Sequence, residues 1–203
     1  MHVDVGGKES SVHVIHSLEK LYAAVERVTR RLDRVHSGRL QCRRGCISCC
    51  VDGITVFQVE ADQIVRHHRE LLESATPAPV GRCAFLDDEG ACRIYDQRPY
   101  VCRTQGYPLR WVEESESGED AWEMRDICPL NDQSTPIVEL EAKDCWTLGP
   151  AESRLRRLQA EYSRIRNREN ATGSSPSQGE SGDADFGRTS LRSLFRSSGG
   201  GTR

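Results

Sequence analysis

Apolar positions near the beginning of the chain recur at the spacing of an amphipathic helix. They fall three or four residues apart between Ser11 and Val35, at Val14, Leu18, Leu21, Val25, Val28, Leu32 and Val35. The opposite face carries basic residues interrupted by acidic ones, which is typical of a solvated face rather than a nucleic-acid surface. Gly38 follows the last apolar position and is expected to end the helix. The pattern predicts an N-terminal helix within residues 1–40.

From residue 41 the pattern changes to short strands and helices. The β-branched and aromatic stretch GITVFQV predicts a strand. The apolar spacing from Glu60 to Leu72 predicts a helix that the following TPAPV ends. The residues expected to face inward on this helix are Ile64, Val65, His68, Leu71 and Leu72.

Two hairpins are expected further along the same segment. The first turns at Asp87-Asp88-Glu89-Gly90, where Gly90 is placed for a positive φ. The second joins YPLRWVE to AWEMRD through the acidic stretch ESESGED. Trp111 and Trp122 are placed to pair across the second hairpin, and packing in the core is favoured over a substrate role for both.

The last part of the chain begins near Pro150. Leu155, Leu158, Tyr162 and Ile165 lie on one stripe, which predicts a helix over residues 149–170. Residues 171–203 are rich in Gly, Ser and charge, so we expect a disordered tail. The LRSLFR stretch within this tail is interpreted as having no structural role; the alternative is a short docking turn.

Composition limits the number of domains and the kinds of partner. The 203 residues suit one domain of residues 41–148 with flanking helices and a tail. A net charge of -3 gives no general attraction for nucleic acid or an anionic membrane, so neither is expected as a partner. The sequence shows no signal peptide and no apolar run of about 18 residues, so a cytoplasmic location is expected.

Nine cysteines in a reducing compartment indicate metal binding or redox chemistry rather than disulfides. Four of them crowd into CRRGCISCC. On a helix, or on a loop that enters one at Gly45, Cys42, Cys46 and Cys49 converge on one centre. Adjacent side chains on a helix diverge by about 100°, so Cys50 is expected to serve a different metal atom or to be a packed thiol.

Further thiols follow downstream. Cys83 and Cys92 flank the first hairpin turn, and Cys102 comes three residues after Pro99. Cys128 begins CPL, and Cys145 lies near the end of the domain. None of the six histidines has the spacing of a Cys/His zinc site, so a site built from thiolates favours zinc or an iron–sulfur cluster.

The stretches CRRGCISCC, CAFLDDEGACRIYDQRPYVCRTQGYPL and CPL together resemble the YkgJ-like (CxxCxxCC) family of zinc- or iron-chelating cysteine-cluster proteins. The resemblance covers about residues 40–130 and implies a metal-binding domain, often described as an iron–sulfur protein. The metal ligands that it implies are Cys42, Cys46, Cys49, Cys50, Cys83, Cys92, Cys102 and Cys128. The first gap here is three residues rather than two, and Cys145 has no clear counterpart in the motif.

Nearby basic residues have two interpretations. Four thiolates on Zn²⁺ leave a net charge of -2, which neighbouring arginines would offset. The alternative is ordinary surface salt bridging. The arginines concerned are Arg43, Arg44, Arg93, Arg98 and Arg103.

These patterns predict a small, metal-organised α+β domain with short hairpins and flanking helices. Its expected function is to hold an iron–sulfur cluster or zinc, in a redox, metal-handling or accessory role that includes a possible protein partner. One alternative is a structural zinc interaction module. Another is a radical S-adenosylmethionine enzyme, which the CxxxCxxC spacing favours, whereas Ser48, the adjacent Cys50 and the missing βα repeats do not. No catalytic residue is assigned, and enzyme activity stays open.

Overall fold

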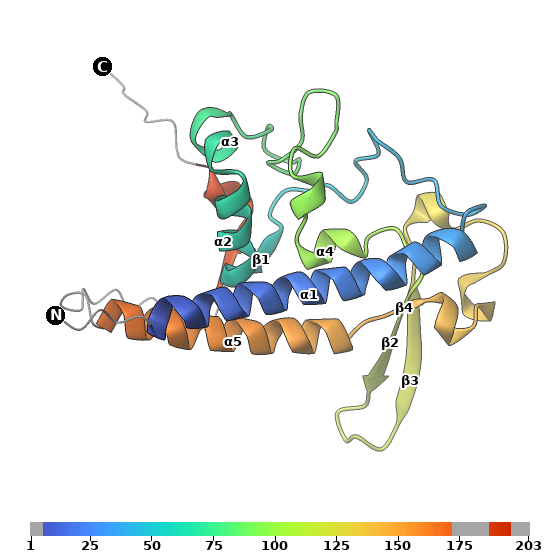
Figure 1. Cartoon of the computed structure of the whole chain (residues 1–203). Coiled ribbons are helices and arrows are strands. Elements are labelled where there is room, and N and C mark those ends of the chain that lie inside the picture. The colour runs from blue at the N-terminus through green and yellow to red at the C-terminus, as the bar shows by residue number, and fades with distance from the viewer. Residues whose placement is uncertain (1–5, 172–186, 196–203) are drawn as a thin grey trace.

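The structure, a computed structural model, describes residues 6–171 and 187–195. It contains helices and two small sheets, so the predicted α+β class is confirmed. The two longest helices, α1 (Gly6–Val35) and α5 (Pro150–Ala171), run antiparallel and side by side (Figure 1). Most of the cysteine-bearing loops lie above α1 in this view.

The N-terminal helix is confirmed, and it begins earlier than Ser11. Val14, Leu18 and Leu32 are fully buried, as their spacing predicts. The prediction is wrong for Val28 and Val35, whose exposed fractions are 42% and 46%. The buried face of α1 includes Ile15 and Tyr22, which lie on the side of the apolar stripe opposite to Val28 and Val35. The face that packs against the protein is therefore rotated away from Val28 and Val35.

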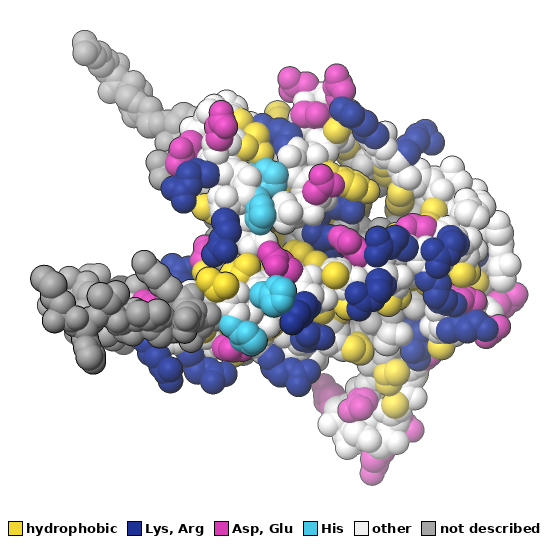
Figure 2. All heavy atoms as spheres, in the orientation of Figure 1, with side chains coloured by type: hydrophobic (Ala, Val, Ile, Leu, Met, Phe, Trp, Pro, Cys, Tyr) yellow, Lys and Arg dark blue, Asp and Glu magenta, His cyan; other side chains and the backbone are white. Residues whose placement is uncertain are grey.

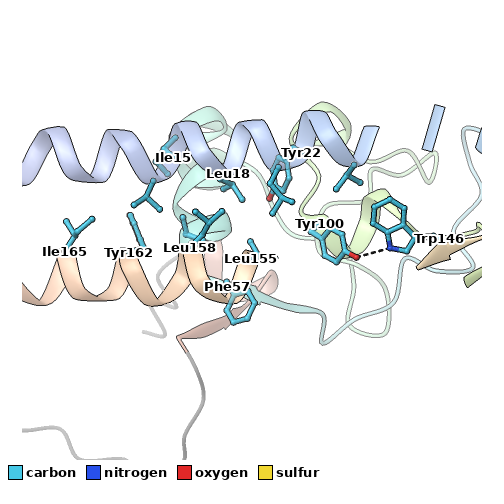
Figure 3. Close-up of a cluster of buried hydrophobic side chains, with 14 of the residues drawn as sticks. Ile15, Leu18, Tyr22, Phe57, Tyr100, Trp146, Leu155, Leu158, Tyr162 and Ile165 are labelled. Atoms are coloured by element: carbon cyan, nitrogen blue, oxygen red, sulfur yellow. Dashed lines mark hydrogen bonds between the residues drawn. The ribbon is translucent and has the colours of Figure 1, made fainter. Parts of the chain in front are cut away.

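Helices α1 and α5 enclose the larger of two hydrophobic clusters (Figure 3). The predicted stripe of α5 is confirmed, since Leu155, Leu158, Tyr162 and Ile165 are all buried against α1. Burying one such side chain contributes about 1.5–3 kcal/mol. The helix pair is therefore stabilised by apolar packing between its own residues.

Two aromatic residues extend this cluster toward the cysteine-bearing segment. Tyr100 lies on α4 (Tyr100–Arg103) and Trp146 on β4 (Trp146–Thr147). The indole Nε1 of Trp146 donates to the Tyr100 hydroxyl oxygen at 3.0 Å (Figure 3), and that hydroxyl donates to Glu152 of α5. Both polar groups of these buried rings are thereby satisfied.

The strand predicted in GITVFQV is present but short, as β1 (Thr55–Phe57). The single helix predicted from Glu60 to Leu72 is wrong: the chain forms α2 (Gln58–His67) and α3 (Arg69–Ser74). His68 separates them with φ -128° and ψ 30°, outside the helical region. Of the residues expected to face inward, Ile64 and Leu72 are buried, whereas Val65, His68 and Leu71 are half-buried.

Glu60, in the first turn of α2, is a buried carboxylate that ties three segments together. Its Oε1 accepts hydrogen bonds from the Tyr22 hydroxyl and the Tyr100 N–H, both at 2.8 Å. Its Oε2 accepts the Phe57 N–H at 3.3 Å, in the manner of a capping box. Burial is the largest cause that raises the pKa of Glu60, and the three hydrogen bonds act against it.

The second predicted hairpin is confirmed as β2 (Leu109–Glu114) and β3 (Ala121–Asp126), with β4 parallel to β2. The expected pairing of the two tryptophans is wrong. Trp111 lies opposite Met124, and Trp122 lies opposite Glu113. Their expected place in the core is also wrong, because Trp122 is 45% exposed and Trp111 is half-buried on a hairpin that projects from the body (Figure 1).

The first predicted hairpin is a closed turn without extended strands. An antiparallel bridge joins Leu86 to Cys92, and the Asp87 N–H donates to Ala91 O at 2.9 Å. Gly90 has the expected positive φ, at 78°. Short 3-10 helices occupy Tyr95–Gln97, Pro129–Asn131, Ile137–Glu139, Ala142–Asp144 and Arg192–Leu194.

Part of the segment expected to be a disordered tail is ordered. Strand β5 (Arg188–Ser190) pairs antiparallel with β1, and Leu191 and Phe195 are buried in a second hydrophobic cluster. The interpretation of LRSLFR as structurally idle is therefore wrong for these residues, because partners distant in sequence supply the apolar surface that the segment lacks. Residues 172–186 and 196–203 lie outside the described residues.

Charge is distributed unevenly over the surface (Figure 2). Acidic side chains gather on the tip of the projecting hairpin, whereas the face of α1 seen in this view carries basic side chains with acidic and histidine side chains among them. Among the residues that the structure describes, no helix has the length and apolar character needed to cross a membrane.

Candidate metal centre

The stretch CRRGCISCC is an irregular loop rather than the start of a helix. Two turns follow each other in it, closed by the Cys46 N–H on Arg43 O and by the Cys50 N–H on Ile47 O, both at 2.9 Å. Gly45 between them has a φ of 84°, which an L side chain rarely adopts. The cysteines of this stretch are therefore placed by turns, and helical spacing does not set their directions.

Exposure differs among the nine thiols. Cys42 and Cys49 are exposed, whereas Cys83 and Cys145 are buried. The half-buried cysteines are Cys46, Cys50, Cys92, Cys102 and Cys128.

Asn131 holds Cys42 in place. The Asn131 side chain has no exposed surface, and its Nδ2 donates to Cys42 Sγ at 3.3 Å and to Gly106 O at 2.8 Å. Its Oδ1 accepts the Gln41 N–H at 2.8 Å, and its own N–H donates to Cys128 O at 2.8 Å. Asn131 thus links the Cys42 and Cys128 segments, through its side-chain amide and its backbone N–H respectively.

Gly106 leaves room for the Cys42 sulfur. A Cβ at this position would lie 2.7 Å from Cys42 Sγ, and the φ of 93° independently disfavours a side chain. Neither Gly106 nor Asn131 was among the site residues predicted from the sequence. The one sequence signal for Asn131 is its place three residues after Cys128, and Gly106 has only its position four residues after Cys102.

Cys83 and Cys92 lie near each other on either side of the closed turn. Each sulfur accepts the backbone N–H of the residue two positions later, Phe85 or Ile94, which lowers the thiol pKa. Burial is the larger cause in both and raises the pKa above its ordinary value. Such N–H contacts favour the thiolate form. They therefore offset part of the cost that burial imposes on a negatively charged sulfur.

The Cys83 N–H donates to Cys50 O at 2.9 Å, which fixes the CRRGCISCC loop against the Cys83 turn. The neighbouring Cys50 thiol is the largest cause that lowers the pKa of Cys49, to about 6. The same contact raises the pKa of Cys50. Cys49 is therefore the more readily ionised member of this pair.

Cys102, on α4, is the most strongly shifted of the downstream thiols. Burial, followed by the nearby Cys83 and Cys92, raises the pKa of Cys102 to about 12. The Arg98 guanidinium acts in the other direction on Cys102, and it also lowers the pKa values of Cys49 and Cys92. An arginine at this position offsets the charge of several thiolates at once.

The mutual influence of the thiols links eight of the nine. The charges of Cys46, Cys49 and Cys128 raise the pKa of Cys42. The charges of Cys49, Cys83 and Cys102 raise the pKa of Cys50. The charges of Cys49, Cys83 and Cys92 raise the pKa of Cys102 in the same way. These eight are the cysteines predicted as ligands from the sequence. Cys49 acts on Cys42, Cys50 and Cys102, so it connects the three groups of neighbours.

Cys145 stands apart from these eight. Its sulfur accepts a hydrogen bond from Arg125 Nη1 at 3.4 Å, and the charges that act on it belong to Arg125, Glu123, Arg110 and Asp144. Its burial at the base of the β2–β3 hairpin gives it a packing role there.

Three of the remaining arginines considered in the sequence have other partners. Arg103 is buried, pairs with Glu26 and lies over the Tyr22 ring, with 4.2 Å from Cζ to the ring centroid. Arg44 pairs with Glu89 on the surface at 3.4 Å. Arg93 bonds Ala84 O at 2.7 Å and also lowers the pKa values of Cys83 and Cys92.

A cavity of about 460 Å³ opens beside the thiols, between α1 and the segment that includes α4. Cys42 and Cys102 contribute to its wall, together with Arg98 and the α1 residues Glu26 and Arg30. Two of the eight linked thiols therefore border open space.

Across the described ranges, no three His, Cys, Asp or Glu side chains are already gathered closely enough to hold a metal ion. The donor set nevertheless fits zinc or an iron–sulfur cluster, because it consists of thiols with N–H and guanidinium groups beside them.

Residues 41–129 match the family model CxxCxxCC, described as a putative zinc- or iron-chelating domain. The match covers the eight linked cysteines and excludes Cys145. No curated protein and no solved structure matches the chain significantly.

Proposed function

Because residues 41–129 match the model of a putative zinc- or iron-chelating domain, we propose that their eight cysteines bind an iron–sulfur cluster or zinc through thiolates. The proposed role is redox chemistry or metal handling, alone or as an accessory to another protein. Cys42, Cys46, Cys49, Cys50, Cys83, Cys92, Cys102 and Cys128 would hold the metal.

The observation that carries this proposal is that all eight cysteines lie within the residues that match the zinc- or iron-chelating family model. The eight sulfurs come from distant parts of the chain, yet each is within electrostatic range of at least one other. Several thiolates brought together repel one another and favour a cation among them. Cys145 lacks such neighbours and serves as an internal comparison.

Two features favour a working metal centre over a purely structural one. Cys42 and Cys102 border the 460 Å³ cavity and Cys42 is exposed, so a small molecule or a partner could reach metal bound there. In addition, the α1–α5 cluster contains no cysteine among its buried residues, so the larger core does not depend on metal.

Bound metal would supply either electron transfer or an exchangeable ion at the cavity. The chain's own groups would tune it: the N–H groups of Phe85 and Ile94 hydrogen-bond the Cys83 and Cys92 sulfurs, and Arg98 offsets negative charge. Hydrogen bonds and charges of this kind orient metal ligands and set their basicity.

The test is metal content and acid-labile sulfide in protein purified without oxygen, for the wild type, C46S, C102S and C145S. We expect C46S and C102S to lose most of the bound metal because each removes a ligand. C145S should retain the wild-type amount. Iron with labile sulfide identifies a cluster, and zinc without sulfide identifies zinc bound by the thiolates alone.

Equal metal content in all four proteins would refute the ligand assignment. Zinc without sulfide, combined with global unfolding when the zinc is removed, would instead favour the structural zinc module.

A further inference from the structure

The C-terminal segment 187–195 is built into the cysteine domain although it follows α5 in the chain. Strand β5 pairs with β1, and the Leu191 N–H donates to Ile54 O at 3.0 Å. Leu191 and Phe195 are 4% and 7% exposed, and the Phe195 ring lies 4.9 Å from that of Phe85 between centroids. The segment lies outside the matched residues 41–129, so it is an addition to the chelating domain.

Arg192 makes the most specific contacts of this segment. Its Nε bonds both carboxylate oxygens of Asp52, at 2.9 and 3.1 Å. Its Nη1 donates to Ala78 O at 2.7 Å, and its Nη2 donates to Arg82 O at 2.8 Å and to Pro79 O at 3.2 Å. The planar guanidinium thus joins two loops, which the single ammonium group of lysine cannot reproduce.

Both of these loops lead directly to cysteines. Asp52 comes two residues after Cys50, and Arg82 immediately precedes Cys83. Asp52 Oδ2 also accepts the Gly81 N–H at 3.0 Å, and the Cys83 N–H bonds Cys50 O at 2.9 Å. The contacts of Arg192 therefore reinforce the place where the Cys50 and Cys83 loops meet.

We propose that Arg192 is a positioning residue of the metal centre: it clamps the Asp52 loop to the 78–82 loop and so holds Cys50 and Cys83 at a fixed separation. This inference rests on the proposed function, in which both cysteines are ligands. Arg192 touches neither sulfur and acts through the two loops. Removing a group that orients metal ligands typically costs about 10- to 100-fold in metal affinity.

Arg188 offers a matched control on the same segment. Its Nη2 donates to Thr55 O at 2.6 Å and its Nε to Thr55 Oγ1 at 3.0 Å, and its Cζ lies 4.7 Å from the Phe57 ring centroid. These contacts attach the segment to β1 without reaching the Asp52 loop or the 78–82 loop. An R188A variant therefore weakens the same segment away from the cysteines.

The experiment compares wild type, R192A, R192K and R188A by two readouts on the full chain. The first is the rate at which a chelator removes bound metal, and the second is the rate at which iodoacetamide modifies Cys83 in reduced, metal-free protein. We expect R192A to raise the first rate about tenfold or more. The Cys83 modification rate should also rise about tenfold, because local opening exposes this buried thiol.

Both rates for R192K should fall between those for R192A and wild type, since lysine keeps the positive charge but lacks the planar set of N–H donors. R188A should stay within about twofold of wild type in both rates, even where its thermal midpoint falls as far as that of R192A. If R192A does not fold, R192K and R188A still make the comparison.

Equal rates for the Arg192 and Arg188 variants would overturn the proposal and leave the segment a general stabiliser of the fold. If the wild type binds no metal, the proposed function fails, but faster modification of Cys83 in R192A than in R188A still supports the clamp. Equal modification in that case would refute the clamp as well.

Discussion

At the scale of single residues, the cysteines of the candidate metal centre are placed by residues that are not predicted metal ligands. Asn131 and Gly106 set the position of Cys42, and Arg192 joins the loops of Cys50 and Cys83. Each acts through geometry that exists only in the folded chain. The thiols could be recognised by residue type and spacing, whereas these supporting residues belong to types that occur throughout any sequence.

Gly106 gives the sharpest prediction at this scale. G106A places a Cβ 2.7 Å from Cys42 Sγ at a φ of 93°, so it should both strain the backbone and displace the sulfur. G118A is the matched control, because Gly118 has a φ of 73° and nothing within 4 Å of its Cβ position. The backbone term should cost about 1–2 kcal/mol of unfolding free energy in either variant.

We expect only G106A to lower metal content as well, because only there does the new methyl group meet a ligand. Urea unfolding of metal-free protein and metal analysis of the purified variants measure the two effects separately. Full metal content in G106A, equal to that in G118A, would contradict the assignment of Cys42.

At the scale of elements, the sequence predicted those whose pattern is long and local. The two long helices follow from apolar stripes of Leu, Val and Tyr, and the β2–β3 hairpin follows from two stretches that flank an acidic, glycine-containing one. The break at His68 and the burial of Leu191 and Phe195 had no such signal, because packing between distant segments decides them. The two tryptophans were misplaced since hairpin register depends on the turn rather than on matching side chains.

Helix α2 carries a prediction through Glu60, whose burial raises the pKa of its carboxyl above the ordinary 4.5. An acid with a raised pKa in the folded state stabilises that state while it is protonated. Its contribution is complete below the unfolded pKa and is lost as the pH rises through the folded pKa. The free energy of unfolding should therefore contain a part that falls as the pH rises above about 4.5, and E60Q should lack it.

The measurement is urea unfolding of metal-free wild type and E60Q between about pH 5 and 8. The free energy of unfolding of the wild type minus that of E60Q should decrease as the pH rises. The sign of this difference is a separate matter, because the side-chain NH₂ of the glutamine faces one of the three donors whose hydrogen bonds Glu60 accepts. A difference that stays constant with pH would show that Glu60 has the same pKa in both states.

At the scale of the whole molecule, the two hydrophobic clusters divide the fold into parts that relate differently to metal. The α1–α5 cluster is built from aliphatic and aromatic side chains, whereas the second cluster includes Cys83 and has Cys50 and Cys92 packed against it. Metal bound by these thiols should stabilise the second cluster more than the α1–α5 cluster, because binding stabilises the segments that the metal crosslinks.

Removal of metal should therefore loosen the molecule unevenly. Hydrogen exchange after chelation should become faster in residues 41–50 and 83–92, while the amides of α1 and α5 change by less than about twofold. Chelator added to C46S, expected to hold little metal, controls for effects of the chelator itself. Loss of protection throughout α1 and α5 would mean that metal holds the entire fold together, as in a structural zinc module. Retained helices beside mobile cysteine loops would mean that the fold supports a centre whose metal can leave and return.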